Sequence, residues 1–184
     1  MEMRMKGRFI LGMNLFHSLI GMEDCTLNFD KIAKILSGEV HQLTASCAHG
    51  DIIDSDVLNL RKIELALMLC AVSDHVDDLV PAKRLCEDVI AQGSGGELEG
   101  IARNNLAALL FEEAIAEGAR EKLDDVENLL RKNLDLPLSE NIHSRARLGL
   151  EHIEHARKKQ IKSMSFQLIY IIPESLNRFS NLHD

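Results

Sequence analysis

The side chains best suited to bind a metal ion lie in one short stretch of the sequence. His41, Cys47 and His49 bring imidazole and thiolate groups together, and both groups are common zinc ligands. Structural zinc sites usually show two close ligand pairs, whereas this stretch has one Cys-x-His pair and a single, more distant His. A zinc site and an ordinary polar loop therefore both remain open. We favour the loop, and we expect neither a metal nor another cofactor.

Acidic and imidazole side chains gather at three further places, and each has a simpler explanation than metal binding. Glu140 and His143 form one Glu-x-x-His motif, but di-metal helical bundles need this motif on two helices. Residues 151–155 contain two histidines without a His-Glu-x-x-His motif. The last aspartates of the run 74–78 are expected to cap the helix that follows. We interpret all three clusters as solvated charge or helix caps.

Signatures of nucleotide binding and of covalent catalysis are missing from the sequence. The glycine-rich run 93–96 lacks the Lys of a P-loop and does not follow a predicted strand. Ser46 and Ser55 have no nucleophile-elbow context, and no cysteine falls in a catalytic signature. We therefore expect that the chain is not an enzyme. A metal-dependent enzyme that uses the His and Cys stretch described above is the least favoured alternative.

The composition describes an acidic, globular chain. It has 184 residues, of which 46% are hydrophobic, which is enough for a sizeable core in one domain or a short array. The net charge of −8 argues against nucleic acid, which is bound through clustered Lys and Arg. The apolar stretch 9–22 is too short for a membrane span and lacks a signal-peptide cleavage site. We therefore expect a cytoplasmic protein with no membrane contact, whose partners are proteins or peptides.

A helical pattern recurs along the chain at intervals of 41 and 42 residues. In each copy a small side chain follows a large one, which lets a neighbouring helix approach closely. Self-similarity at a fixed period is typical of stacked helical hairpins, because one hairpin cannot bury its apolar face alone. The pattern therefore predicts an all-α fold. The three large-small pairs are Leu65-Ala66, Leu106-Ala107 and Leu148-Gly149.

Hydrophobic periodicity, caps and breakers together predict where the helices begin and end. The second helix should start at Asn28 or Asp30 and end at Gly38, and the weak periodicity of residues 39–54 indicates an irregular region. We expect residues 1–54 to form an N-terminal helical cap or degenerate hairpin, and residues 55–184 to form the repeats and a C-terminal apolar helix. The predicted helices span 9–22, 28–36, 56–72, 78–91, 97–116, 120–134, 140–159 and 161–172.

The stretch Ala102-Arg-Asn-Asn-Leu-Ala-Ala-Leu-Leu-Phe111, followed by Val126-Glu-Asn-Leu-Leu-Arg-Lys-Asn-Leu-Asp-Leu-Pro137, resembles a tetratricopeptide repeat. In that family, helix A carries a large-small pair and a Pro follows helix B. The resemblance covers residues 56–172, although the period exceeds the roughly 34 residues of the family and its aromatic positions are mostly aliphatic here. Longer helices or a related helical-hairpin solenoid would explain both departures. The resemblance implies stacked antiparallel helical hairpins that form a short right-handed α-solenoid.

The same resemblance implies that the first helix of each hairpin lines a concave groove that binds a partner segment. One subclass of the family grips a C-terminal carboxylate with five Lys, Asn and Arg side chains. Asn105 and Arg147 fall at two of those positions, but Ile63, Leu67 and His143 occupy the others. We therefore expect a groove that binds an extended or helical peptide by other contacts. The predicted partner-binding residues are Arg103, Asn104, Asn105, Glu112 and Arg147.

The apolar stretch at the C-terminus predicts an interface. A terminal solenoid helix should have a polar outer face, yet residues 166–172 are apolar on nearly all sides. Either the N-terminal helix folds across this stretch or a second subunit covers it, because exposed apolar patches usually mark interfaces. We predict a homodimer that forms through the C-terminal helix.

The function that these features favour is that of a protein–protein interaction adaptor, which binds a partner peptide on the concave helix-A surface. The repeats, the acidity and the missing catalytic motifs all agree with it. The alternative is a small chaperone or regulator for secreted or transcriptional client proteins, since small acidic helical-repeat chaperones have a similar size. A hydrophobic groove with one defined client would distinguish this alternative.

Overall fold

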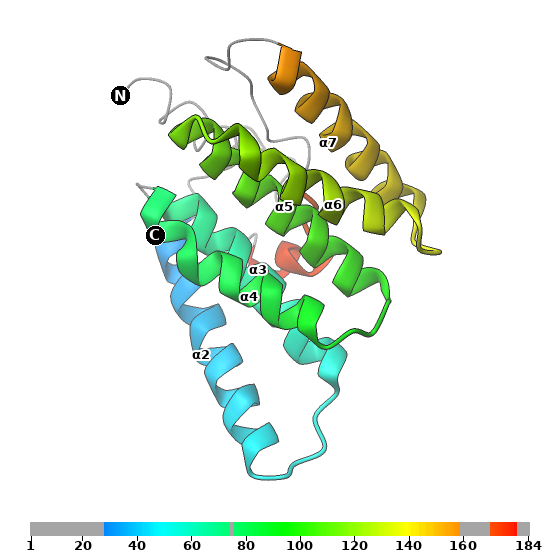
Figure 1. Cartoon of the computed structure of the whole chain (residues 1–184). Helices are drawn as coiled ribbons and strands as arrows, with labels where there is room; N and C mark the ends of the chain where they lie inside the picture. Colours follow the sequence, from blue (N-terminus) through cyan, green and yellow to red (C-terminus); the bar gives the residue numbers. More distant parts are fainter. Residues whose placement is uncertain (1–27, 74–75, 159–169, 180–184) are drawn as a thin grey trace.

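The computed structural model describes residues 28–73, 76–158 and 170–179 (Figure 1). Within these ranges the chain is helical and contains no strand, so the predicted all-α class is confirmed. The predicted first helix over 9–22 and most of the predicted last helix lie outside the described residues. The α-helices are α2 (Phe29–Ala48), α3 (Ser55–Val72), α4 (Val80–Ala91), α5 (Glu97–Glu117), α6 (Leu123–Leu134) and α7 (Glu140–Lys158), and the 3-10 helices are η1 (Val76–Leu79), η2 (Arg120–Lys122) and η3 (Glu174–Phe179).

The helices pack in the order in which they follow along the chain. Each helix from α2 to α7 contacts the next one, and α3 also contacts α5, as α5 contacts α7 (Figure 1). The helix α5 therefore lies at the centre of the array and touches helices on both sides. Side chains on different faces of α5 must consequently contact different neighbours.

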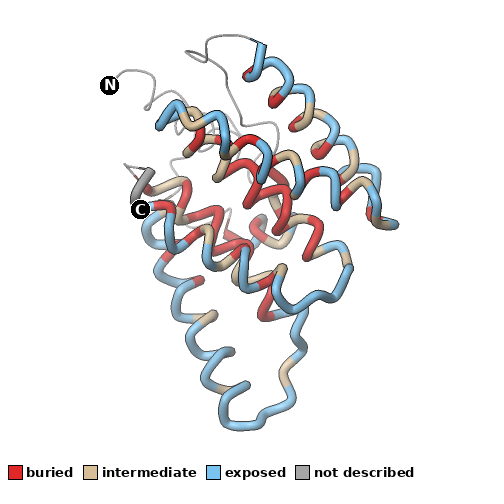
Figure 2. Tube along the Cα trace, viewed as in Figure 1, coloured by how far each residue is buried: buried red, intermediate tan, exposed pale blue. Residues whose placement is uncertain are grey.

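The core lies between these helices and includes the small residues of the repeated pairs (Figure 2). Ala66 and Ala107 are 1% and 0% exposed, and Gly149 is also buried. Small side chains at these positions allow the close helix contacts that the pattern predicts. The thiols of Cys70 and Cys86 are buried as well, in agreement with their positions on apolar helix faces.

The helix α2 is longer than the sequence indicates. Asn28 is its N-cap, as expected, and its Oδ1 accepts a hydrogen bond of 2.9 Å from the main-chain N of Lys31. Gly38 does not end the helix, which continues to Ala48. A glycine inside a helix costs only about 1 kcal/mol relative to Ala, and the later turns offset that cost. The predicted irregular region is therefore wrong for residues 39–48, which are helical and largely exposed (Figure 2).

The helix α4 begins later than predicted, because the 3-10 helix η1 precedes it. Its N-cap is Leu79, and no side chain caps it, so the expected capping by an aspartate of the run 74–78 is wrong. Pro81 lies in the first turn, where its missing N–H has no partner to lose. At the other breakers the prediction is confirmed: α5 ends at Gly118, whose φ of +72° is the left-handed conformation that favours glycine.

The last predicted helix is wrong at its C-terminal end. Residues 170–173 are not helical, and η3 follows them. Pro173 accounts for part of this, because its ring disfavours a helical conformation of the residue before it. In addition, the main-chain N–H and C=O of Ile171 form hydrogen bonds with the side chain of Asn105 on α5 instead of within a helix. No helix within the described ranges combines the length and the apolar character that a membrane crossing requires.

Candidate partner-binding face

Residues 170–179, which we call the C-terminal segment, lie against α3 and α5 (red in Figure 1). Its apolar side chains are inserted among the helices, and its polar groups bind residues of the predicted helix-A positions. Its buried side chains include Tyr170, Ile171, Leu176 and Phe179, with exposed fractions of 0% to 5%. We call the helix surface that they cover the C-terminal contact face.

Asn105 on α5 holds the main chain of the segment through two hydrogen bonds. Its Nδ2 donates to the carbonyl O of Ile171 at 3.2 Å, and the main-chain N of Ile171 donates to its Oδ1 at 2.8 Å. The side chain of Asn105 is almost fully buried, so water cannot replace these bonds. A side-chain amide that pairs with both main-chain groups of one residue recognises extended backbone without regard to side-chain type. Non-helical main chain, as at residues 170–173, is thus the ligand that Asn105 suits.

Two apolar side chains of the segment flank this contact. Ile171 packs with Leu138 and Ile142, the second of which belongs to α7. Tyr170 is 3% exposed, and its hydroxyl donates a hydrogen bond of 3.2 Å to Oε1 of Glu112 on α5. Burial, followed by the negative charge of Glu112, raises the pKa of Tyr170 well above 10.0, so the hydroxyl stays protonated and can donate.

The other end of the C-terminal contact face is acidic. The carboxylate of Glu64 on α3 is fully buried and accepts hydrogen bonds from Ser175 at 2.5 Å and from Arg178 at 3.1 Å. Arg61 binds the same carboxylate at 2.7 Å from its own helix. Glu39 on α2 pairs with Arg61 at 3.0 Å and with Arg178 at 2.9 Å. Two carboxylates and two guanidinium groups therefore join α2, α3 and the segment.

Two of the five predicted binding residues have a different environment. Arg103 and Asn104 are buried between α5, α6 and α7, in a group that we call the α5 polar cluster and that also contains Glu99 and Asn133. Asn133 Nδ2 donates to Gly100 O at 2.8 Å and to Asn104 Oδ1 at 2.9 Å. Arg103 donates to Asn133 Oδ1 at 3.1 Å and pairs with Glu99.

The α5 polar cluster also reaches α7 and has no access to an external ligand. Asn104 Nδ2 donates to the carbonyl O of Ile142 on α7 at 3.2 Å. Burial lowers the pKa of Arg103 from its usual value, while the neighbouring Glu99 supplies the opposite charge. The hydrogen bonds of Arg103 and Asn104 all end on atoms of the helices themselves. Both residues therefore hold helices together.

The remaining predicted residues, Glu112 and Arg147, lie apart. Glu112 contacts the C-terminal segment through Tyr170, whereas Arg147 is exposed on α7 and pairs with Glu140. Among the described residues, no group binds both Asn105 and Arg147. Asn105 and Glu112 therefore both contact the C-terminal segment. None of the five predicted residues lies at the acidic end of the face, where Glu39 and Glu64 bind Arg178.

The candidate metal ligands do not converge. His41 and Cys47 lie on the exposed half of α2, and His49 is its C-cap. Within the described ranges, no three His, Cys, Asp or Glu side chains come close enough to hold a metal ion. Cys86 is no better placed for chemistry, because burial and then the charge of Glu87 raise the pKa of its thiol to about 12.

Glu64 is the most informative residue that the sequence prediction missed. A signal for it exists, since Glu64 interrupts the otherwise apolar run from Ile63 to Cys70 in the middle of α3. A charged residue inside such a run is expected to be buried with a partner. Its partner Arg178 lies more than a hundred positions away in the sequence, so the pairing itself leaves no local pattern.

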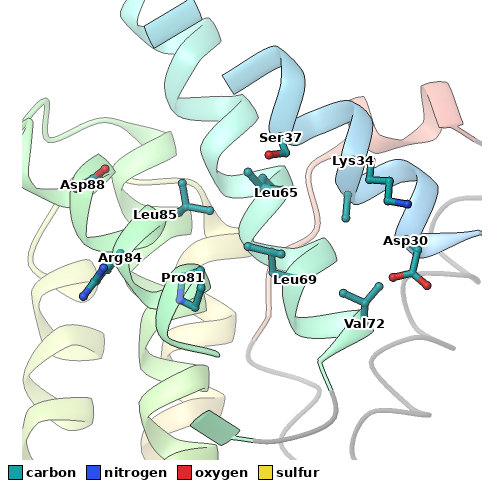
Figure 3. Close-up of a pocket in the computed structure, with 11 residues that line it drawn as sticks. Asp30, Lys34, Ser37, Leu65, Leu69, Val72, Pro81, Arg84, Leu85 and Asp88 are labelled. Atoms are coloured by element: carbon teal, nitrogen blue, oxygen red, sulfur yellow. The ribbon is translucent and has the colours of Figure 1, made fainter. Parts of the chain in front are cut away.

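A second surface feature lies on the other side of α3. It is an open groove of about 620 Å³ between α2 and α4, with leucines of α3 in its floor (Figure 3). Charges of both signs stand on its rim, from Asp30 and Lys34 on α2 and from Arg84 and Asp88 on α4. This mixture selects for neither an acidic nor a basic ligand. The groove contains none of the predicted binding residues.

No protein-family profile, curated protein sequence or solved structure shows a significant match to the chain.

Proposed function

We propose that this chain is a protein–protein interaction adaptor whose α3–α5–α7 surface binds an extended segment of a partner protein. The observation that carries the proposal is the pair of hydrogen bonds between Asn105 and the main chain of Ile171. The surface already holds ten residues of peptide, 170–179, by main-chain bonds, apolar contacts and charge. These are the means by which grooves bind peptides.

The finer architecture belongs to the same proposal. We take the helices to be stacked antiparallel hairpins of a short right-handed α-solenoid similar to tetratricopeptide repeats, with α3, α5 and α7 as the A helices. The contacts of α3 with α5 and of α5 with α7 support this assignment, since A helices of successive hairpins are neighbours. The burial of Ala66, Ala107 and Gly149 supports it as well.

The homodimer stays a prediction. Part of the apolar stretch that prompted it is buried within the same chain. Tyr170 and Ile171, which belong to the stretch that prompted it, are covered by helices of the same chain. A second subunit is therefore not needed to bury these two residues. Sedimentation of the full chain tests the dimer directly.

A peptide-display selection against the full chain tests the proposed function. The library should lack Tyr and Trp, because Tyr170 is the single tyrosine of the chain, which has no Trp, and its emission then reports on the face alone. We expect the selected peptides to share a motif, to change the emission of Tyr170 and to alter hydrogen exchange in α3 and α5. Residues 41–48 of α2, which lie away from the face, serve as the internal control.

Two results would contradict the adaptor function. One is a selection without any shared motif. The other is a set of peptides that bind without changing Tyr170 emission or hydrogen exchange in α3 and α5.

A further inference from the structure

The C-terminal segment occupies the surface that the proposed function assigns to a partner. The segment makes three kinds of contact. None of them requires that the segment belong to the same chain. Asn105 recognises main-chain groups, Glu112 accepts from an aromatic hydroxyl, and Glu64 accepts from a hydroxyl and a guanidinium. Another peptide that offered the same groups in the same order would make the same bonds.

Part of the polar network of the helices does not depend on the segment. Glu64 keeps its bond to Arg61, and Glu39 keeps its bond to the same side chain, so neither carboxylate loses its last cation when the segment leaves. The α5 polar cluster shares no side chain with the C-terminal contact face, and its bonds to α6 and α7 persist. The helices therefore have their own means of staying together.

The charge of the face selects what can replace the segment. Three carboxylates, of Glu39, Glu64 and Glu112, line it, and the segment brings a guanidinium and two hydroxyl donors to them. An acidic peptide would place further negative charge beside these groups, where Arg61 is the cation that Glu39 and Glu64 share. A replacement ligand must therefore be basic or neutral at this end.

We infer that residues 170–179 are an internal ligand of the C-terminal contact face, and that the partner which displaces them is a peptide with a non-helical aromatic–aliphatic pair followed by a helical turn that carries a basic side chain, as η3 carries Arg178. The inference rests on the proposed function, since it names the partner that the adaptor binds. The aromatic side chain takes the place of Tyr170, and the aliphatic one that of Ile171. The basic side chain follows the aliphatic one by about seven residues, as Arg178 does, and reaches Glu39 and Glu64.

Competition between the two ligands sets the apparent affinity. The internal segment is tethered to the face, so an external peptide binds only the fraction of molecules in which the segment has left. Changes in the segment itself raise that fraction without altering the face. Substitution of Asn105 is expected to weaken the binding of the internal segment and of the external peptide alike. The ratio of their affinities for the face then stays almost unchanged.

The test measures binding of a fluorescent peptide of residues 170–179 to the full chain and to the full-length Tyr170→Ala, Arg178→Ala variant. We expect the variant to bind the peptide at least about tenfold more tightly than wild type, because its own segment is weakened. A peptide with an N-methylated Ile171 is the matched control. It keeps every side chain but cannot donate to Asn105, and we expect its affinity for the variant to be about tenfold lower.

A second variant guards against a failure to fold. Tyr170→Phe removes only the bond to Glu112, and the full chain with this change should bind the peptide slightly more tightly than wild type. Circular dichroism establishes that each variant remains helical. Equal binding by wild type and folded variants, or no binding by any of them, would overturn the inference.

The outcomes also separate this inference from the proposed function. If peptides from the display library bind the face but the peptide of residues 170–179 does not, the adaptor stands and the internal ligand is refuted. If the peptide of residues 170–179 binds but no library peptide does, the segment is a structural strap and the adaptor is refuted. A full chain that sediments as a dimer and is split by the peptide would place a second copy's segment on the face, which also overturns the inference.

Discussion

Asn104 and Asn105 are neighbours on α5 and are both buried, yet they belong to different regions of the molecule. Asn104 is part of the α5 polar cluster and binds Asn133 and the main chain of α7. Asn105 is part of the C-terminal contact face and binds the main chain of Ile171. Successive residues of a helix point roughly 100° apart, so one helix can serve both regions.

The difference shows which buried polar group is a candidate for binding. The hydrogen bonds of the α5 polar cluster end on the helices that form the array and on the loop before α5. The C-terminal contact face differs, because the two hydrogen bonds of Asn105 end on the main chain of residue 171, outside the helices α2 to α7. Burial alone does not distinguish the two regions, whereas the identity of the bonded partner does.

The largest effect is expected from breaking the α5 polar cluster. Asn133→Ala removes the partners of Gly100, Asn104 and Arg103 together and leaves buried polar groups without hydrogen bonds. We expect the free energy of unfolding to fall by about 3 kcal/mol, measured by urea denaturation. The neighbouring Lys132→Ala is the control, since Lys132 is exposed, and it should change stability by less than about 0.5 kcal/mol.

The next effect separates the two asparagines. Asn105→Ala should lower stability by about 1–2 kcal/mol and expose Tyr170 to solvent, since the segment loses both main-chain bonds. Asn104→Ala should lower stability by a similar amount but leave Tyr170 buried. Tyrosine emission in the folded variants measures the difference. The same emission change in both variants would show that the two regions are one.

A smaller effect concerns the close approach of α5 to α7. A Cβ at Gly100 would lie 2.7 Å from Cδ1 of Leu138 and 3.1 Å from Cδ1 of Ile142, whereas one at Gly38 would meet nothing within 4 Å. Gly38→Ala should stabilise the protein by about 0.5–1 kcal/mol. Gly100→Ala has the same gain in helix propensity but must displace both side chains, so we expect it to be less stable than Gly38→Ala by about 1 kcal/mol. Equal stability of the two variants in thermal unfolding would mean that the contact adjusts freely.

Ionisation of Tyr170 has the smallest expected effect on stability near neutral pH. At high pH it offers a further way to compare wild type with Asn105→Ala. The pKa of Tyr170 is raised in the folded chain, so its contribution is complete below the usual value of 10.0 and is lost as the pH rises through the folded value. Absorbance titration should show tyrosinate forming at a higher pH in wild type than in Asn105→Ala. Coincident titration curves would show that Asn105 is not needed to keep Tyr170 buried against the helices.

The sequence predicts the positions of the helices better than it predicts which neighbour each helix face contacts. Leu106 and Ala107 fix the inward side of α5, and Asn105 and Glu112, which the sequence proposes as partner-binding residues, contact the chain's own C-terminal segment. The sequence cannot separate Asn104 from Asn105, because that needs the positions of α7 and of the C-terminal segment. The conformation of residues 170–172 could not be predicted either, since the main-chain partner of Ile171 lies 66 positions earlier.

The separation of the segment from the helices that it binds also sets an order of events. Ser175 and Glu64 are 111 positions apart, whereas the helix pairs close short loops. Short loops close at a lower entropic cost and are expected to form first, and chains fold from their N-terminus during synthesis. The helices of the C-terminal contact face are therefore expected to assemble before residues 170–179 reach them. If the proposed function holds, a partner present during synthesis would not have to displace residues 170–179.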